Sequence, residues 1–433
     1  MTSPVASSGS SPAGLTVRDR QYSPLLKLID GSVGILQKIG ILKRLNQLDA
    51  EHIKAAASKR TGLSDFGDPS FEPPMNKLME VLPRSSLSRL GTLLTEQTLV
   101  KAMSNRLRIH DHIKRHPDVL DVPIDRPIFV LGFPRTGTTL LQNLLGLDEA
   151  SRSLKFWELQ TPVPLSTDLE VDARKRLAIA RRTLQLAYLV APEQKQIHEI
   201  KPDTAEECWP LFSNSFAVLN YDLTSMFTEY GRWLLTYDMT GPYRFYRQTL
   251  QLLAHQRGES RFILKCPEHL WFIDALLEVF PDARIVWTHR DPVASVASYC
   301  SMISLGQRML HGHFDPLKTG QHIQSRFITG IQRAMEARQR AEALGKGDQF
   351  FDVDFKTLVQ DSPAMVRQIK EWADIPHDKA SEARVQRWMT TERGDKRGAH
   401  KYSAEVYGLD GHAIHREYAD YIDRFKIPLK PLD

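Results

Sequence analysis

The sequence has 433 residues, of which 42% are hydrophobic and 25% charged, so it is long enough to bury one large core and a satellite domain. Its formal net charge of +5 suits an anionic ligand but is too small a basic excess for a protein that binds nucleic acid. Three scattered cysteines, Cys208, Cys266 and Cys300, exclude a disulfide framework and a CxxC metal site, and they favour a reducing compartment such as the cytoplasm.

The chain opens on a segment with no sign of secondary structure. Residues 1–14 are rich in Ser, Pro, Ala and Gly, and they lack the basic and apolar regions of a secretory signal, so we expect residues 1–20 to be a disordered tail. From residue 21 to residue 120, apolar side chains recur at helical spacing, as in Leu90, Leu93 and Leu94. This spacing predicts a helical N-terminal region.

The pattern changes near residue 127 and indicates a second kind of structure. Residues 128–131 form a short apolar run that ends at Gly132 and is followed by a helical pattern, which predicts a strand, a turn and a helix. The same order returns after strands expected at 262–264, 284–288 and 350–355. Alternating strands and helices predict an α/β fold over residues 121–433, with a parallel sheet flanked by helices.

Residues 160–258 are expected to form a helical insertion that binds the acceptor, because helical patterns there are broken by several prolines. Within it, residues 174–192 form an amphipathic pattern, which predicts a surface helix or, as the alternative, a helix lying on a membrane. Residues 209–246 are rich in aromatic side chains. They indicate a hydrophobic pocket, although ordinary core packing explains them nearly as well.

Residues 132–139, with the sequence GFPRTGTT, follow a strand and open a helix, so their backbone N–H groups can bind phosphate oxygens. The glycine spacing copies a nucleoside-triphosphate loop, but Thr138 stands where that loop carries lysine. Arg135 would supply the positive charge instead. The alternative is a simple strand-to-helix turn capped by Thr136. The residues expected to contact the ligand are Arg135, Thr136, Gly137, Thr138 and Thr139.

A second anion site is predicted after the strand at 284–288. There Asp291 can cap the next helix and Pro292 fits its first turn. Arg290 emerges on the side where Ser298 lies, so the two could bind a second phosphate at the same edge of the sheet. An ion pair between Arg290 and Asp291 is the simpler interpretation.

These segments resemble the sulfotransferase superfamily. Residues 132–139 look like its 5′-phosphosulfate loop, with Arg135 where many cytosolic members carry lysine, and Arg290 with Ser298 looks like its 3′-phosphate site. Residues 61–67, 156–159, 265–267 and 402–409 are similar to a bacterial-type subgroup. The resemblance implies a P-loop-like sheet, 3′-phosphoadenosine-5′-phosphosulfate as co-substrate and no metal. Arg397 and Gly398 resemble part of the loop that closes over the 3′-phosphate.

Transfer of a sulfuryl group to an alcohol needs a base and a cation. By resemblance, Lys265 is the expected cation and Glu158 the expected base, and a lysine at the surface of an edge strand is the alternative for Lys265. His198 is the rival base, because imidazole has a suitable pKa. Glu207 is interpreted as a helix cap, because Thr204 stands three residues before it.

Taken together, these features predict a cytoplasmic sulfotransferase that acts on a hydroxyl of a small, hydrophobic molecule. Two alternatives stay open. One is a non-catalytic nucleotide-binding or membrane-peripheral scaffold, and the other is a P-loop kinase without the usual lysine. We expect no nucleic-acid partner, and contact with a membrane surface is possible through the amphipathic segment.

Overall fold

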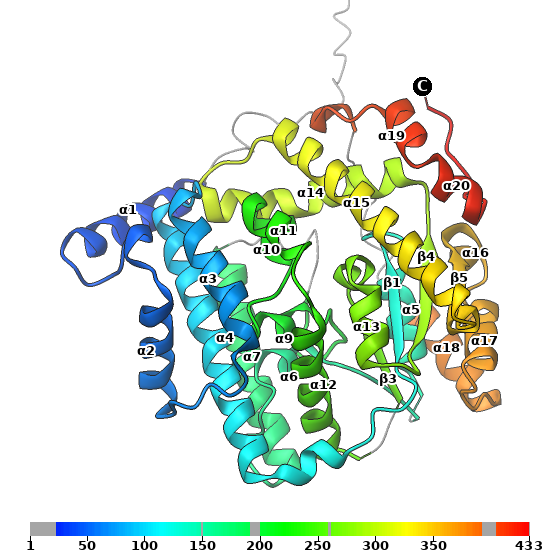
Figure 1. Cartoon of the computed structure of the whole chain (residues 1–433), viewed down its shortest axis with the longest axis horizontal. Helices are drawn as coiled ribbons and strands as arrows, with labels where there is room; N and C mark the ends of the chain where they lie inside the picture. The colour runs from blue at the N-terminus through cyan, green and yellow to red at the C-terminus, as the bar shows by residue number, and fades with distance from the viewer. Residues whose placement is uncertain (1–22, 149, 191–199, 259–260, 392–403, 433) are drawn as a thin grey trace, which may run out of the picture.

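The computed structural model describes residues 23–148, 150–190, 200–258, 261–391 and 404–432 (Figure 1). The expected tail at 1–20 lies outside these residues. A parallel sheet occupies one side of the molecule and the N-terminal helices the other (Figure 1). The N-terminal helices are α1 (Pro24–Lys38), α2 (Ala50–Thr61), α3 (Glu72–Val81) and α4 (Arg89–Arg115).

Five parallel strands form the sheet, in the order β2-β3-β1-β4-β5. Their bounds are Ile128–Gly132 for β1, Ser151–Ser153 for β2, Arg261–Lys265 for β3, Arg284–His289 for β4 and Phe350–Asp354 for β5. Val130 of β1 lies opposite Lys265 of β3 and Val286 of β4. This register places the carboxyl ends of β1, β3 and β4 at one edge of the sheet. The predicted α/β fold with a parallel sheet is confirmed.

Helices cover both faces of the sheet, which explains why β1 is an unbroken apolar run. Phe129 and Leu131 of β1 belong to the larger core, whereas Ile128 and Val130 belong to a smaller core on the opposite face. The helices that follow strands are α5 (Thr138–Leu145), α13 (Ile273–Val279), α14 (Pro292–His311), α15 (Pro316–Ala343), α16 (Phe355–Gln360), α17 (Ser362–Trp372), α18 (Lys379–Thr391), α19 (Gly411–Glu417) and α20 (Ala419–Phe425).

The segment between β2 and β3 is helical within its described residues. It contains α6 (Phe156–Gln160), α7 (Leu169–Val190), α9 (Trp209–Ser213), α10 (Asn220–Ser225), α11 (Thr228–Leu234) and α12 (Thr240–His255). Aromatic side chains of this segment, such as Phe212, Phe216 and Tyr230, are buried in the larger core. Core packing therefore accounts for much of the aromatic character of residues 209–246.

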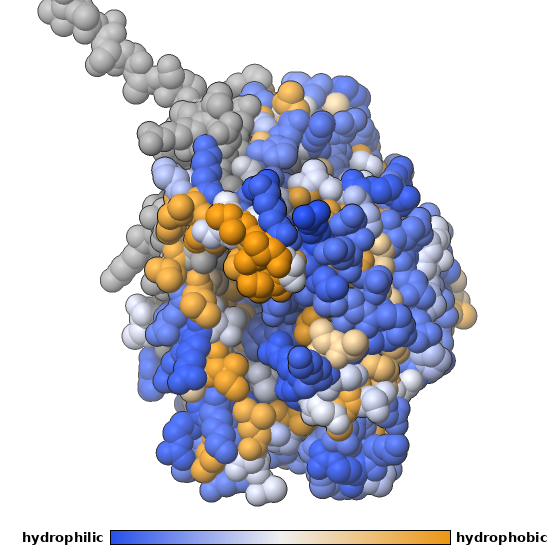
Figure 2. Space-filling view, turned by 90° about the vertical axis from the view of Figure 1, so that its left-hand side faces the viewer, coloured by the Kyte–Doolittle hydropathy of each residue, from blue (hydrophilic) through white to orange (hydrophobic). Residues whose placement is uncertain are grey.

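One face of α1 is buried and the other is apolar but exposed. Leu26 and Val33 pack on Leu90 of α4, whereas Leu28 and Ile35 are 70% and 63% exposed. Figure 2 shows apolar side chains gathered on the side of the molecule that carries α1. Among the described residues, no helix is long and apolar enough to cross a membrane.

Helix α4 crosses α14 at a glycine, and this contact gives a first prediction. A Cβ atom at Gly91 would lie 1.8 Å from the carbonyl oxygen of Leu310, so Gly91→Ala should push the helices apart. We expect a loss of about 1–3 kcal/mol in the free energy of unfolding, measured by chemical denaturation. Gly31→Ala is the control, because a Cβ there meets nothing within 4 Å. Equal stability of the two variants would contradict the close crossing.

Candidate functional site

The loop between β1 and α5 is fixed against β4 by glycine and threonine. Gly132 has φ +140° and Gly137 has φ +91°, conformations that side chains disfavour. A Cβ at Gly132 would lie 2.1 Å from Oγ1 of Thr288. The Thr136 hydroxyl donates to the carbonyl of Phe133 at 2.6 Å and lies 2.5 Å from the Thr288 hydroxyl. The side chain of Thr136 therefore stabilises the loop through these two contacts.

A cavity of about 470 Å³ lies at the carboxyl edge of the sheet. Residues that follow four different strands line it, namely Arg135 after β1, Cys266 after β3, Arg290 after β4 and Phe355 after β5. Open parallel sheets bind ligands at this edge. Among the predicted binding residues, those that line the cavity are Arg135, Gly137, Thr138, Thr139 and Arg290.

The two predicted arginines meet at this cavity. Nη1 of Arg290 donates to the carbonyl oxygen of Arg135 at 2.6 Å, and its guanidinium lies over the ring of Phe355, 4.3 Å from the centroid. Asp291 caps α14 through the N–H of Val293 and also contacts His415 at 3.1 Å. Two arginines thus line the cavity beside the N-terminus of α5, an arrangement that suits an anion.

The other predicted binding residues are not at this wall. Ser298 is buried on α14 and is not among the residues that line the cavity, although the next residue, Tyr299, lines it. Arg397, Gly398 and His198 lie outside the described residues. Their expected roles stay predictions.

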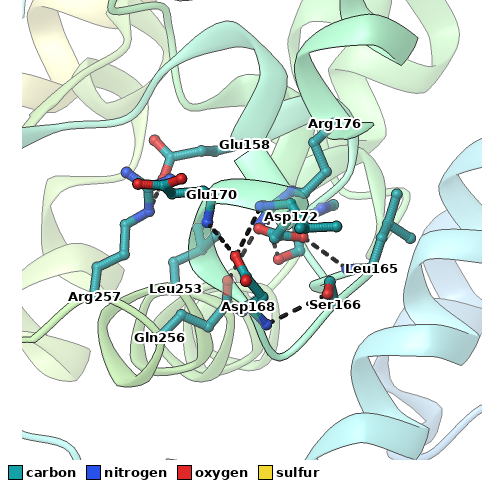
Figure 3. Close-up of polar contacts among 12 residues, drawn as sticks. Glu158, Leu165, Ser166, Asp168, Glu170, Asp172, Arg176, Leu253, Gln256 and Arg257 are labelled. Atoms are coloured by element: carbon teal, nitrogen blue, oxygen red, sulfur yellow. Dashed lines mark hydrogen bonds and ion pairs between the residues drawn. The ribbon is translucent and has the colours of Figure 1, made fainter. Parts of the chain in front are cut away.

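Glu158 lies in a buried cluster of charged side chains. Its carboxylate accepts the backbone N–H of Lys155 at 2.9 Å and forms ion pairs with Arg152 at 2.5 Å and Arg257 at 3.8 Å. Figure 3 shows Glu158 next to Arg257. It is buried and does not line the cavity. The carboxylate of Glu158 caps α6, and its role as the base stays a prediction that this position does not favour.

A carboxylate that does face the cavity is Glu207. Its Oε1 accepts a hydrogen bond from Nζ of Lys265 at 2.9 Å, and its side chain is 31% exposed whereas that of Lys265 is 2% exposed. Burial acts to lower the pKa of Lys265, but the charges of Glu207 and Glu206 outweigh it, so the pKa is raised. Lys265 sits on an inner strand, between β2 and β1, and it is not a surface lysine.

The structure also corrects the interpretation of Glu207 as a helix cap. Residues 204–207 are not helical. Ala205 forms a bridge with Lys155, and the Thr204 hydroxyl donates to the carbonyl of Lys201. The N–H of Cys208 donates to the carbonyl of Lys265 at 3.0 Å. This bond holds the segment beside the end of β3, which is why Glu207 reaches Lys265.

A second carboxyl group in the cavity, Glu268, was not predicted from the sequence. It follows the singled-out segment 265–267 and accepts the N–H groups of Leu219 and Asn220. Burial raises its pKa to about 8, against the opposing effect of these two hydrogen bonds. Within the described part of the chain, no cluster of three or more His, Cys, Asp or Glu side chains could hold a metal ion.

Comparisons with known proteins agree on one family. The model of the sulfotransferase family matches residues 127–379, more than half of the chain. The solved structures of sulfotransferase STF9 from Mycobacterium avium and STF1 from Mycobacterium tuberculosis are 29% and 28% identical, with TM-scores of 0.80 and 0.77. They cover 90% and 87% of this chain, and 100% of their own chains. The omega-hydroxy-beta-dihydromenaquinone-9 sulfotransferase Stf3 of Mycobacterium bovis is 22% identical over 70% of this chain and 75% of its own.

The raised pKa of Glu268 predicts how stability depends on pH. Between about pH 4.5 and pH 8 the unfolded chain ionises this carboxyl group while the folded chain keeps the proton, so stability falls as the pH rises. From pH 5 to pH 8, wild type should lose on the order of 3 kcal/mol relative to Glu268→Gln, measured by urea denaturation. Glu371→Gln, at an exposed position, is the control and should run parallel to wild type. Parallel curves for all three would contradict the assignment.

Proposed function

Because this chain belongs to the sulfotransferase family, we propose that it transfers a sulfuryl group from 3′-phosphoadenosine-5′-phosphosulfate to a hydroxyl of a hydrophobic acceptor. One observation carries the proposal. Arg135, Arg290 and Glu207, which suit an anionic donor and a proton-losing acceptor, line a single cavity. The family itself argues against a P-loop kinase.

The wall of the cavity formed by the 132–139 loop would hold the donor. Arg135 and the backbone N–H groups at Thr138 and Thr139 supply positive charge and hydrogen-bond donors there. Arg290 follows β4 on the same side. For the 3′-phosphate we retain Ser298, Arg397 and Gly398 as proposed contacts. The absence of lysine at position 138 fits a donor with less charge near the transferred group than a triphosphate has.

The acceptor would bind against the apolar part of the lining. Apolar side chains that line the cavity are Leu223, Met302, Ile303, Leu305 and Met309. Residues 160–258 contribute Glu207, Trp209 and Leu223 to the lining, which supports the proposal that they form an acceptor-binding insertion. The name of the relative Stf3 describes a sulfotransferase of a hydroxylated menaquinone, and we infer that a hydrophobic alcohol is the acceptor class here too.

In the reaction, Glu207 takes the proton of the acceptor hydroxyl as the new O–S bond forms. The S–O bond to the donor phosphate breaks, and the electron pair leaves with the phosphate oxygen. Arg135 offsets the charge that grows on that oxygen. Lys265 acts through Glu207, since its ammonium holds the carboxylate in place and does not line the cavity. We therefore propose Lys265 as a positioning residue and not as the cation that contacts the phosphate.

Substitution of the two cavity carboxyl groups tests this assignment. Glu207→Gln should lower kcat about 10²- to 10⁴-fold and leave donor affinity within about threefold, because the base does not contact the donor. Glu268→Gln should lower kcat less than about tenfold. Both are measured with labelled donor and pooled hydroxylated metabolites. The reverse ranking would make Glu268 the base, and equal turnover of all variants would exclude both groups as the base. Absence of transfer by wild type with the donor bound would favour a non-catalytic scaffold.

We further propose that the exposed face of α1 rests on an anionic lipid surface. Apolar side chains at Leu28, Ile35 and Ile39 are each more than 60% exposed, and the exposed cations Lys27 and Lys38 lie on the same helix. Apolar side chains flanked by basic ones bind membrane interfaces. The chain's three free cysteines suit the reducing cytoplasm, where such a surface is anionic.

Vesicle sedimentation tests the lipid contact. Wild type should sediment with vesicles of phosphatidylglycerol and phosphatidylcholine, and Ile35→Ser with Ile39→Ser should reduce the bound fraction at least about fivefold. Leu344→Ser is the control, since Leu344 is 75% exposed at the end of α15. If the double variant binds vesicles as wild type does, or if it converts a dimer into a monomer, the lipid contact is wrong.

A further inference from the structure

A second cavity of about 430 Å³ lies beside the first. Its walls include Leu94 and Thr98 of α4 and Asn214 at the end of α9. Trp209 and Met309 line both cavities. The two spaces therefore adjoin, and these two side chains stand between them.

The size of the first cavity makes its neighbour relevant to the acceptor. A volume of about 470 Å³ is at the lower end of the range for a single drug-sized ligand. The proposed reaction brings two molecules together at this place, a nucleotide and an alcohol. The first cavity can hold the reacting end of the alcohol, but the rest of an elongated acceptor needs further space.

The surface of the second cavity is mainly apolar, although polar side chains such as Asn105 and Gln160 also line it. Leu78, Leu99 and Phe227 line it. Lys101 also lines it, and burial lowers the pKa of this lysine to about 8, helped by the charge of Arg60. These features describe a poorly hydrated space that suits a hydrocarbon chain.

One buried polar side chain points to a polar group on the ligand. Asn214 is 1% exposed, and neither its amide nitrogen nor its amide oxygen has a hydrogen-bond partner among the described residues. A buried amide without partners costs about 1–3 kcal/mol per unsatisfied group, so such groups are rare in folded proteins. A hydroxyl or carbonyl group on a bound molecule would satisfy this amide.

We propose that the second cavity binds the distal half of the acceptor, an elongated apolar alcohol with a second hydroxyl or a carbonyl group near its far end. The reacting hydroxyl lies at Glu207, the chain passes Trp209 and Met309, and the distal polar group meets Asn214. This inference rests on the proposed sulfotransferase function and names its acceptor class.

A chain-length series tests the inference. We compare kcat/KM for 1-butanol, 1-dodecanol and 1,12-dodecanediol in the presence of the donor. In wild type the long alcohols should exceed 1-butanol by at least about 100-fold, since each buried methylene contributes about 0.8 kcal/mol. Absence of a chain-length effect would overturn the inference.

Two variants localise the effect. Thr98→Trp fills the cavity from an exposed position of α4, and it should lower kcat/KM at least about tenfold for the long alcohols and leave 1-butanol unchanged. Thr390→Trp on α18 is the matched control, because both threonine hydroxyls donate to the carbonyl four residues earlier. Asn214→Leu should abolish any preference for the diol over 1-dodecanol. Equal losses for short and long alcohols in Thr98→Trp would overturn the inference.

Failure of the proposed function would give a different experimental result from failure of the second-cavity inference. If the donor binds and no alcohol is sulfated, including 1-butanol, the sulfotransferase proposal fails. Calorimetric binding of 1,12-dodecanediol then tests the second cavity alone. Binding to wild type that Thr98→Trp weakens and Thr390→Trp leaves intact supports the cavity as a ligand site, whereas equal binding to all three overturns it.

Discussion

The site depends on the close contact between the 132–139 loop and strand β4. Gly132 approaches Thr288 so closely that a side chain cannot be accommodated, and the Thr136 and Thr288 hydroxyls meet across the same gap. Arg290 follows Thr288 by two residues, and its guanidinium donates to the carbonyl of Arg135. This packing contact holds the 132–139 loop next to Arg290, although the two are far apart in the sequence. We treat them as a single unit, which we propose binds the anion.

Both basic and acidic residues line the cavity at this unit. Arg135, Arg290 and the N-terminus of α5 contribute to the lining, and so do Glu207 and Glu268. We propose that the two arginines attract the anionic donor to their part of the cavity, whereas Glu268 keeps its proton near pH 7 and adds no negative charge there. Nζ of Lys265 donates a hydrogen bond to the Glu207 carboxylate, and Lys265 does not line the cavity.

Much of the fold could be predicted from the sequence, because strands β1, β3, β4 and β5 are short apolar runs followed by helical patterns. Strand β2 was missed, since its three residues, Ser-Arg-Ser, are polar and pair only because β3 lies beside them. Arg135 and Arg290 could be placed because they follow the ends of β1 and β4 within three residues, at the carboxyl edge of the sheet where open parallel sheets bind ligands.

The carboxylate that we propose as the base could not be found in this way. Glu207 lies 58 residues before Lys265, and a local Thr-x-x-Glu pattern indicates a cap unless the tertiary contact is known. The position after the first helix favours Glu158, but the carboxylate of Glu158 forms ion pairs with Arg152 and Arg257 and does not line the cavity. The second cavity could not be predicted from the sequence either. Its walls include parts of α4, α9 and the end of α14, which come together only in the folded chain.

A crystal structure with bound 3′-phosphoadenosine-5′-phosphate tests the central claim most directly. The account predicts that the 5′-phosphate contacts the 132–139 loop, with Arg135 and Arg290 on the same nucleotide and Glu207 facing the open side of the 5′-phosphate. A nucleotide bound elsewhere, or bound in this cavity with both guanidinium groups directed away from it, would contradict the account.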